Sequence, residues 1–216
     1  MAFPVAKSTR VEVSTAYIAD KTITGITAAK PPVVTAVAHG LATGDVGYLK
    51  DLEGMNAYSG QAVRVTVLTA DTFRLDGLDF VGAGVFQSGK FVASNMSTLG
   101  LLAAARSYSI SEASAGVVTQ QVLLDEQATQ TAGPLAAQNC TFSSFSEMQS
   151  AGMQAVINAA YKQDSMVFRI RLGNGEERVF RGIPGAPSES ATAGDNVENG
   201  FTVVIEGRPL FLPAVV

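Results

Sequence analysis

Two side chains in this sequence could do acid–base or nucleophilic chemistry, and neither has the partners that such chemistry needs. His39 is the single histidine. No second histidine and no acid at ligand spacing accompany it, as a metal site or a general base would require. Cys140, the single cysteine, needs a base to form its thiolate, and only His39 could serve. We interpret His39 as a turn residue beside Gly40 and Cys140 as a buried structural thiol. The sequence therefore predicts a protein without catalytic residue, metal site or cofactor, and not an enzyme.

The glycine-rich run at residues 81–91 could be a phosphate-binding loop, in which backbone N–H groups cradle the ligand. Gly82, Gly84 and Gly89 supply the flexibility. No helix start follows them, however, and the Gly-Lys pair lacks the earlier spacing of a P-loop. The run is therefore interpreted as turns.

A third candidate chemistry is anion binding by arginines close together in the sequence, which are Arg169, Arg171, Arg178 and Arg181. Arginine pairs well with phosphate. Only Phe168 and Phe180 interleave as stacking platforms, and the formal net charge is −4, which fits repulsion of a polyanion. We therefore expect these arginines to make salt bridges to an adjacent protein subunit.

The acidic residues of the same half of the chain leave two alternatives open. They either line a channel or bind a cation, or they form a scattered solvated face. The set is Glu176, Glu177, Glu189, Asp195, Glu198 and Glu206.

The arginines lie in the strongest local signal of the sequence, residues 166–182. Two alternating runs meet there at Asn174-Gly175, the dipeptide that best supplies the positive φ angles of a type I′ turn. An isolated hairpin is marginal in water, so this one needs further strands or another chain. The expected facing pairs are Ile170–Val179 and Leu172–Glu177 on one surface, and Arg169–Phe180 and Arg171–Arg178 on the other.

Alternation and turn residues predict further strands along the chain. One helix is expected, from an N-cap at Ser146 with a capping box to Gln149, as far as about Lys162. Its small and apolar residues fall on one stripe that can pack flat against a sheet, namely Met148, Gly152, Ala155, Val156 and Ala159. The predicted strands lie in residues 9–17, 32–37, 46–52, 62–68, 71–77, 108–111, 140–145 and 200–206.

Residues 112–139 form a long connector rich in Ala, Gln, Thr and Gly. Loops of this length are uncommon inside compact domains unless they are functional or disordered. Branched apolar residues in its middle argue against simple disorder, so we expect it to become ordered against a neighbouring subunit.

The size and composition of the chain suit two small β units. It has 216 residues, of which 47% are hydrophobic and 16% charged, enough for a core and without a broad basic surface. No apolar run of membrane-spanning length occurs, and the first residues lack the apolar core of a signal peptide. We expect a soluble product, made in the host cytoplasm and without membrane insertion.

The hairpin turn, the following Val179-Phe180-Arg181-Gly182, and a later strand ending in Gly207-Arg208-Pro209 resemble the tail tube proteins of long, flexible-tailed phages of the lambda type. The resemblance implies a mainly β fold, a sandwich or barrel with one flanking α-helix, in residues 1–22 and 98–216. It implies a structural virion protein that forms stacked hexameric rings, with six copies in each ring, through which DNA is ejected. The implied partners are other copies of the chain, the tape-measure protein, the tail terminator and distal tail proteins, with phage DNA only in transit.

A second resemblance concerns residues 23–97, which read as an inserted small β-barrel domain on the outer surface. Residues 34–41, 43–45 and 53–56 resemble the small β-barrel half-domain of the catalytic-cysteine region of ubiquitin-activating enzyme. That half-domain holds no catalytic cysteine, so the resemblance implies a fold and no activity.

On this hypothesis, the apolar residues of the connector and of the C-terminal end make the contacts between subunits or rings. They are Val117, Val118, Val122, Leu123, Leu124, Phe211 and Leu212. The alternative is a virion decoration or host-adhesion module in which the small barrel binds a surface molecule, since such barrels serve as binding platforms.

Overall fold

The computed structural model describes residues 9–94, 99–120 and 129–214. Over these residues the chain is mainly β with one α-helix, α1 (Ala151–Lys162), which confirms the predicted fold class. A short 3₁₀ helix, η1 (Asn56–Tyr58), is the other helical element in these residues. In the part of the chain that is described, no helix has the length and apolar character needed to cross a bilayer.

The larger of the two main sheets is antiparallel and curls around a core. Its strand order is β10 (Ala105–Ile110), β13 (Asn139–Phe145), β17 (Glu198–Leu212), β15 (Glu177–Pro184), β14 (Met166–Arg171), β1 (Arg10–Ser14) and β9 (Leu99–Leu102). The short β16 (Ser188–Ser190) also pairs with β17.

Aromatic side chains fill the inside of this curl. Phe142 of β13 stacks on Phe201 of β17 and on Phe168 of β14, with ring centroids 5.0 and 5.9 Å apart. Phe168 in turn stacks on Phe180 of β15 at 5.3 Å. The larger sheet is thus a sandwich, in which β10, β13 and the first half of β17 face β15, β14, β1 and β9 across one core.

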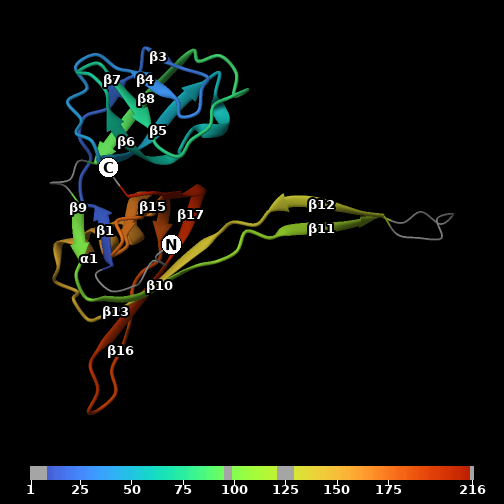
Figure 1. Ribbon diagram of the computed structural model, residues 1–216. Coiled ribbons are helices and arrows are strands. Elements are labelled where there is room, and N and C mark those ends of the chain that lie inside the picture. Colours follow the sequence, from blue (N-terminus) through green and yellow to red (C-terminus); the bar gives the residue numbers. More distant parts are fainter. Residues whose placement is uncertain (1–8, 95–98, 121–128, 215–216) are drawn as a thin grey trace.

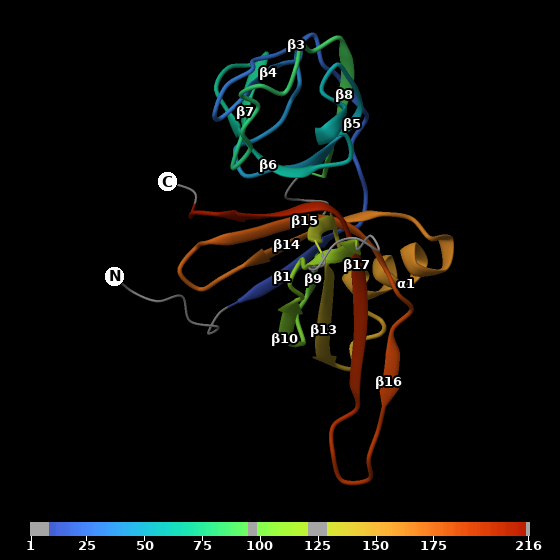
Figure 2. The same cartoon turned by 90° about the vertical axis from the view of Figure 1, so that its right-hand side faces the viewer.

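The smaller sheet lies against the outside of the second of these layers (Figures 1 and 2). Its strand order is β2 (Lys21–Thr22), β8 (Ser88–Ser94), β5 (Val46–Glu53), β6 (Ala62–Val67), β7 (Thr72–Leu75), β4 (Val33–Thr35) and β3 (Gly25–Ile26). Its core includes Val167, Val179, Leu210 and Leu212 of the larger sheet. Apolar contact therefore continues from one sheet to the other.

The long connector is not a structureless loop. Its two ends form β11 (Ala115–Gln120) and β12 (Thr129–Leu135), which pair with each other as an antiparallel two-stranded sheet. Figure 1 shows this ribbon projecting from the body as a continuation of β10 and β13. We call β11 and β12 the arm.

The predicted register of the Asn-Gly hairpin is wrong by one residue. Gly175 has φ +86°, whereas Asn174 has no positive φ, as a type I′ turn would require of both. The loop instead has three residues, 173–175, closed by hydrogen bonds from Gly175 N to Leu172 O (2.9 Å) and from Leu172 N to Glu176 O (2.8 Å). The observed pairs are Phe168–Phe180, Arg169–Val179, Ile170–Arg178 and Arg171–Glu177.

This slip changes which side chains share a face, because neighbouring residues of a strand point to opposite sides. The expected opposition of Arg171 and Arg178 does not occur. Arg171 faces Glu177 instead, and the two side chains form an ion pair of 2.8 Å.

Two other local predictions also need correction. The helix N-cap is Ser150, whose Oγ accepts from Met153 N at 3.2 Å; Ser146 precedes a separate turn that Ser150 N closes on Glu147 O. The predicted C-terminal end at Lys162 is confirmed, with Gln163 in the left-handed conformation. Strand β17 does not end at Gly-Arg-Pro but continues through it to Leu212.

The predicted flat packing of the helix through small residues is confirmed at Gly152. A Cβ built on Gly100 of β9 would lie 2.7 Å from Gly152 Cα and 2.7 Å from Thr15 Cγ2. Backbone therefore approaches backbone at this crossing, and neither residue has room for a side chain.

We expect Gly100→Ala to destabilise the subunit by about 1–3 kcal/mol, the usual cost of forcing an extra methyl group into a packed site. The measurement is urea unfolding followed by circular dichroism. Gly25→Ala is the matched control, because a Cβ at Gly25 meets nothing within 4 Å. Equal unfolding midpoints for the two variants would contradict the close packing of α1 on β9.

Candidate assembly surfaces

The observed hairpin register directs three of the four hairpin arginines, Arg169, Arg171 and Arg181, toward the smaller sheet. The side chain of Arg169 is fully buried. Its Nε donates to Glu12 Oε2 at 2.6 Å, and its Nη1 donates to Gly44 O of the smaller sheet's connecting loop at 3.0 Å. Arg169 therefore links the two sheets of one chain.

Glu177 is the centre of an ionic network between the sheets. Its side chain is 1% exposed, and it accepts from Arg171 at 2.8 Å and from Arg64 of β6 at 3.2 Å. Arg64, 5% exposed, also binds Asp76 at 2.9 Å and donates to Pro213 O at 2.9 Å. A buried carboxylate between two guanidinium groups is stable only when its hydrogen bonds are complete, so the network fixes how the sheets face each other.

Arg178 and Arg181 also have partners within the chain. Arg178 donates to Glu176 at 2.8 Å and lies over the ring of Phe211, 5.0 Å from its centroid. The hydrogen bond from Arg178 is the main cause of a lowered pKa of Glu176. Arg181 pairs with Glu206 at 3.3 Å and lies 4.4 Å over Tyr48 of β5.

These contacts place the arginines predicted for subunit interfaces inside the chain or at its own sheet junction. Contacts of the four arginines with a second subunit stay a prediction. The six acidic residues do not form one surface, because Glu177 is buried while Glu176, Glu206 and Glu198 each pair with an arginine.

A bulge in β17 is held by a side chain of the smaller sheet. Gly207 has φ +76°, and the register against β15 shifts between Glu206 and Leu210. The side-chain amide of Gln61 forms hydrogen bonds with both backbone polar groups of Arg208. Gln61 Oε1 accepts from Arg208 N at 3.1 Å, and Gln61 Nε2 donates to Arg208 O at 2.7 Å. The bulge bends β17 from one layer of the sandwich to the other.

Replacing Gln61 by Ala is expected to leave both backbone groups of Arg208 without their partner. The two hydrogen bonds are part-buried, and each contributes about 1 kcal/mol, so urea unfolding should show a loss of stability. Gln87→Ala is the control, because Gln87 is exposed and its removal should change little. A Gln61 variant as stable as the Gln87 variant would show that the bulge does not need this side chain.

The arm carries part of the predicted contact set. Val117 and Val118 lie in β11, opposite Ala132 and Thr131 of β12. Val122, Leu123 and Leu124 lie outside the described residues. Leu135, at the base of β12, is 69% exposed. Over the described residues, β11 and β12 pair with no other strand.

The two predicted C-terminal contact residues have opposite environments. Phe211 is 63% exposed, whereas Leu212 is 2% exposed and belongs to the shared core. A Cβ at Gly77 would meet Leu212 Cδ2 at 2.5 Å. Phe211 is thus free to meet another molecule, and Leu212 stabilises the junction of the two sheets.

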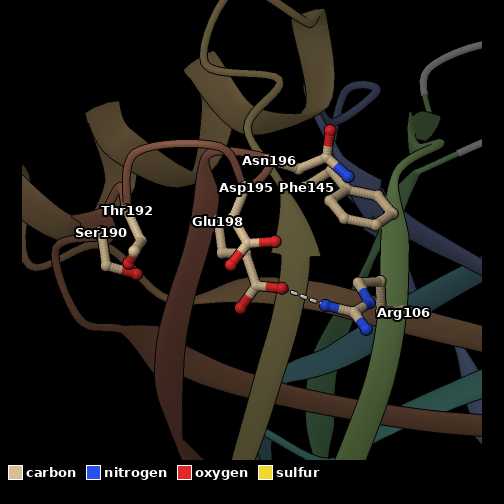
Figure 3. Close-up of a pocket in the computed structure, with 7 residues that line it drawn as sticks. All are labelled: Arg106, Phe145, Ser190, Thr192, Asp195, Asn196 and Glu198. Atoms are coloured by element: carbon tan, nitrogen blue, oxygen red, sulfur yellow. Dashed lines mark hydrogen bonds and ion pairs between the residues drawn. The ribbon is translucent and has the colours of Figure 1, made fainter.

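The hairpin of β16 and β17 borders a polar pocket at the far end of the sandwich (Figure 3). Arg106 of β10 pairs with Glu198 of β17 and lies 4.7 Å over the ring of Phe145. The pocket is also lined by Ser190, Thr192, Asp195 and Asn196. Arg106 and Glu198 neutralise each other, and Asp195 adds a second carboxylate to the pocket wall.

His39 and Cys140 have the structural environments that the sequence predicted for them. Leu41 N donates to His39 Nδ1 at 3.0 Å, and the other ring nitrogen, Nε2, lies 3.0 Å from Thr69 O. The imidazole is buried edge-on against Phe73. Burial raises the pKa of the Cys140 thiol to about 12, so this thiol stays protonated and unreactive at neutral pH.

Sequence reasoning missed Gln61, Arg64 and β8. Gln61 and Arg64 gave no signal, because Arg208 and Glu177, which join them to the larger sheet, lie more than a hundred residues away along the chain. Gly82 and Gly84 form turns with positive φ, as predicted, but Gly89 lies within β8.

Comparison with known proteins agrees with this architecture. The model of the family described as phage tail tube protein, TTP, matches residues 53–213. No curated protein sequence matches the chain. The matched region takes in β6, β7 and β8 of the smaller sheet, the arm, and the larger sheet apart from β1. The chain belongs to the phage tail tube protein family, whose members are structural proteins of the virion tail.

Proposed function

We propose that this chain assembles into closed rings of identical subunits, and that the rings stack into the tube through which phage DNA is ejected. The observation that carries this proposal is the arm, a ribbon that extends from the body and pairs only with itself in the described residues. Two-stranded ribbons are marginal in water. A neighbouring subunit that covers the arm would stabilise it and connect one ring to the next.

Open sheet edges support the lateral contact within a ring. Among the described residues, β10 pairs only with β13, and β9 pairs only with β1. Uncovered strand edges invite pairing with other chains. A head-to-tail contact that closes under rotation forms a ring, and a second such contact along the axis forms a filament. The family resemblance supports six copies in each ring.

The smaller sheet is the candidate for an inserted barrel domain, residues 23–97, on the outside of the tube. Its resemblance to the half-domain of ubiquitin-activating enzyme supports a fold and no activity. Simple excision would not be a clean test of its place, because it would expose Val167, Val179 and Leu210 of the larger sheet. The ionic network and Gln61 would lose partners as well.

The partners follow from the same proposal. They are other copies of the chain, a tape-measure protein in the lumen, and tail terminator and distal tail proteins at the two ends, with assembly in the host cytoplasm. DNA would pass through without stable binding, which agrees with the net charge of −4.

Negative-stain electron microscopy of the concentrated protein tests the function. We expect rings and tubes of constant diameter, whose number rises with protein concentration. A protein that remains monomeric at every concentration and binds host cells would instead support a decoration or adhesion module.

A further inference from the structure

One face of the sandwich is covered with hydroxyl groups, and its charged side chains are confined to its two ends. It consists of the outward side chains of β10, β13, the first half of β17 and β16, and we call it the hydroxyl face. Strand pairing aligns its members in two rows across the sheet. One row is Ser107, Ser143, Gly200 and Ser188, and the other is Ser109, Thr141 and Thr202.

Hydrogen bonds join these side chains across the strands. Ser107 Oγ and Ser143 Oγ are 2.7 Å apart, and Thr141 Oγ1 and Thr202 Oγ1 are 3.4 Å apart. Ser188 Oγ donates to Gly200 O at 3.1 Å. The hydroxyl groups bind one another in part, which leaves a flat polar surface without a strong donor or acceptor cluster.

Charged side chains are confined to the ends of the hydroxyl face, where they are paired. Arg106 and Glu198 pair at one end, and Glu206 binds Arg181 at the other. The main apolar member is Val204, 48% exposed. The face therefore lacks both the apolar area of a stable protein interface and the cations that bind phosphates.

The position of the hydroxyl face in the molecule limits where it can lie in a ring. The smaller sheet covers the opposite layer of the sandwich, and β10, β13 and β17 lie on the side away from it (Figure 2). A ring has less room at its inner radius than at its outer radius. Subunits of this shape close most easily with the smaller sheet outward and the hydroxyl face inward.

We propose that the hydroxyl face lines the bore of the tube and that its partner is double-stranded DNA in transit. This inference rests on the proposed function and assigns one face to the lumen. The arginine at the end of this wall, Arg106, is already paired with Glu198, and the two rows of hydroxyl groups carry no Lys or Arg. Such a wall releases few counterions from DNA, so it holds the duplex weakly. Carboxylates in the wall would repel the phosphates of DNA and hinder its entry. Neutral hydroxyl groups avoid this repulsion.

Single-cysteine labelling tests which face lines the bore. Cys140 is buried and its thiol has a pKa of about 12, so the native chain gives little background. Thr202→Cys reports the hydroxyl face, and Val85→Cys, on an exposed loop of the smaller sheet, is the matched control. Each variant is treated with a small maleimide and with a polyethylene glycol maleimide, as subunits and as long tubes.

We expect both reagents to label both variants as subunits. In tubes, Thr202→Cys should keep reacting with the small maleimide and lose reaction with the large one, while Val85→Cys keeps both. Reaction of Thr202→Cys tubes with the large reagent would place the face outside. Loss of reaction with both reagents would place the hydroxyl face in a subunit interface. Either result would overturn the inference. Ser109→Cys serves the same purpose where Thr202→Cys does not assemble.

A charge variant tests the partner. Tubes of Thr202→Lys, assembled with short duplex DNA, should protect the DNA from nuclease, and unmodified tubes should not. Val85→Lys tubes carry the same charge outside and should bind DNA without protecting it. Equal protection by the two lysine variants would overturn the assignment of DNA to this face. Failure of the unmodified protein to form tubes would contradict the proposed function itself, and the bore with it.

Discussion

Removal of the arm is expected to leave a folded subunit that forms no long tubes. The change deletes residues 115–135 and joins the flanking residues by a short Gly-Ser turn. The arm pairs only with itself in the described residues, so its loss removes no strand from either main sheet. Backbone hydrogen bonds from Ser111 N to Asn139 O and from Ala136 N to Ser114 O lie at its base, and the first of them would remain.

The expected effect on assembly is large because an arm supplies contact area that the compact body does not. A lasting protein interface buries more than about 1,000 Å². A ribbon that becomes fully ordered only against its neighbour can supply such area, and the cost of ordering it keeps free subunits slow to polymerise.

Electron microscopy and sedimentation velocity of the shortened protein check this prediction. Circular dichroism and the urea midpoint should match those of the full chain. Val117→Thr with Val118→Thr is the milder companion variant, since it keeps β-forming residues but removes apolar area from β11. Long tubes from the shortened protein would show that the arm is not the contact between rings.

The second large effect is expected at Glu177, which should be among the most sensitive positions for stability. Glu177→Gln removes the charge between Arg64 and Arg171 while keeping the volume of the side chain. Loss of one partner of a buried ion pair costs about 3–5 kcal/mol, because the remaining charges lose their compensation inside the protein. The urea midpoint of the subunit should fall accordingly.

The adjacent Glu176→Gln is the matched control. Glu176 also pairs with an arginine, at 2.8 Å, but its side chain is 35% exposed, and solvent screens such a pair. We expect its urea midpoint to stay close to that of the unmodified chain. Similar losses at both positions would mean that burial of the network contributes nothing to its effect.

Much of the fold could be predicted from the sequence because alternation marks half-buried strands. The runs at residues 46–52 and 62–68 correspond to β5 and β6. Prediction failed where the local sequence is compatible with two loop geometries. Gly173-Asn174-Gly175 accepts a two-residue or a three-residue loop, and the choice between them moves Arg171 from Arg178 to Glu177.

The surfaces for assembly were less accessible to sequence reasoning. Because both are apolar, Phe211 and Leu212 were predicted as contact residues between subunits or rings. Their opposite exposures follow from alternation along β17 after the Gly207 bulge. The bulge depends on Gln61, which lies 147 residues away in sequence from Arg208. Such long-range pairing has no local signature in the sequence. The hydroxyl face likewise emerges only when β10, β13 and β17 lie side by side.

Cryo-electron microscopy of the assembled protein tests the central claim, that these subunits stack into a tube through their arms, most directly. We predict stacked rings in which density for β11 and β12 crosses to the adjacent ring and the smaller sheet lies at the outer radius. Isolated particles, or tubes in which each arm folds back onto its own subunit, would contradict this account.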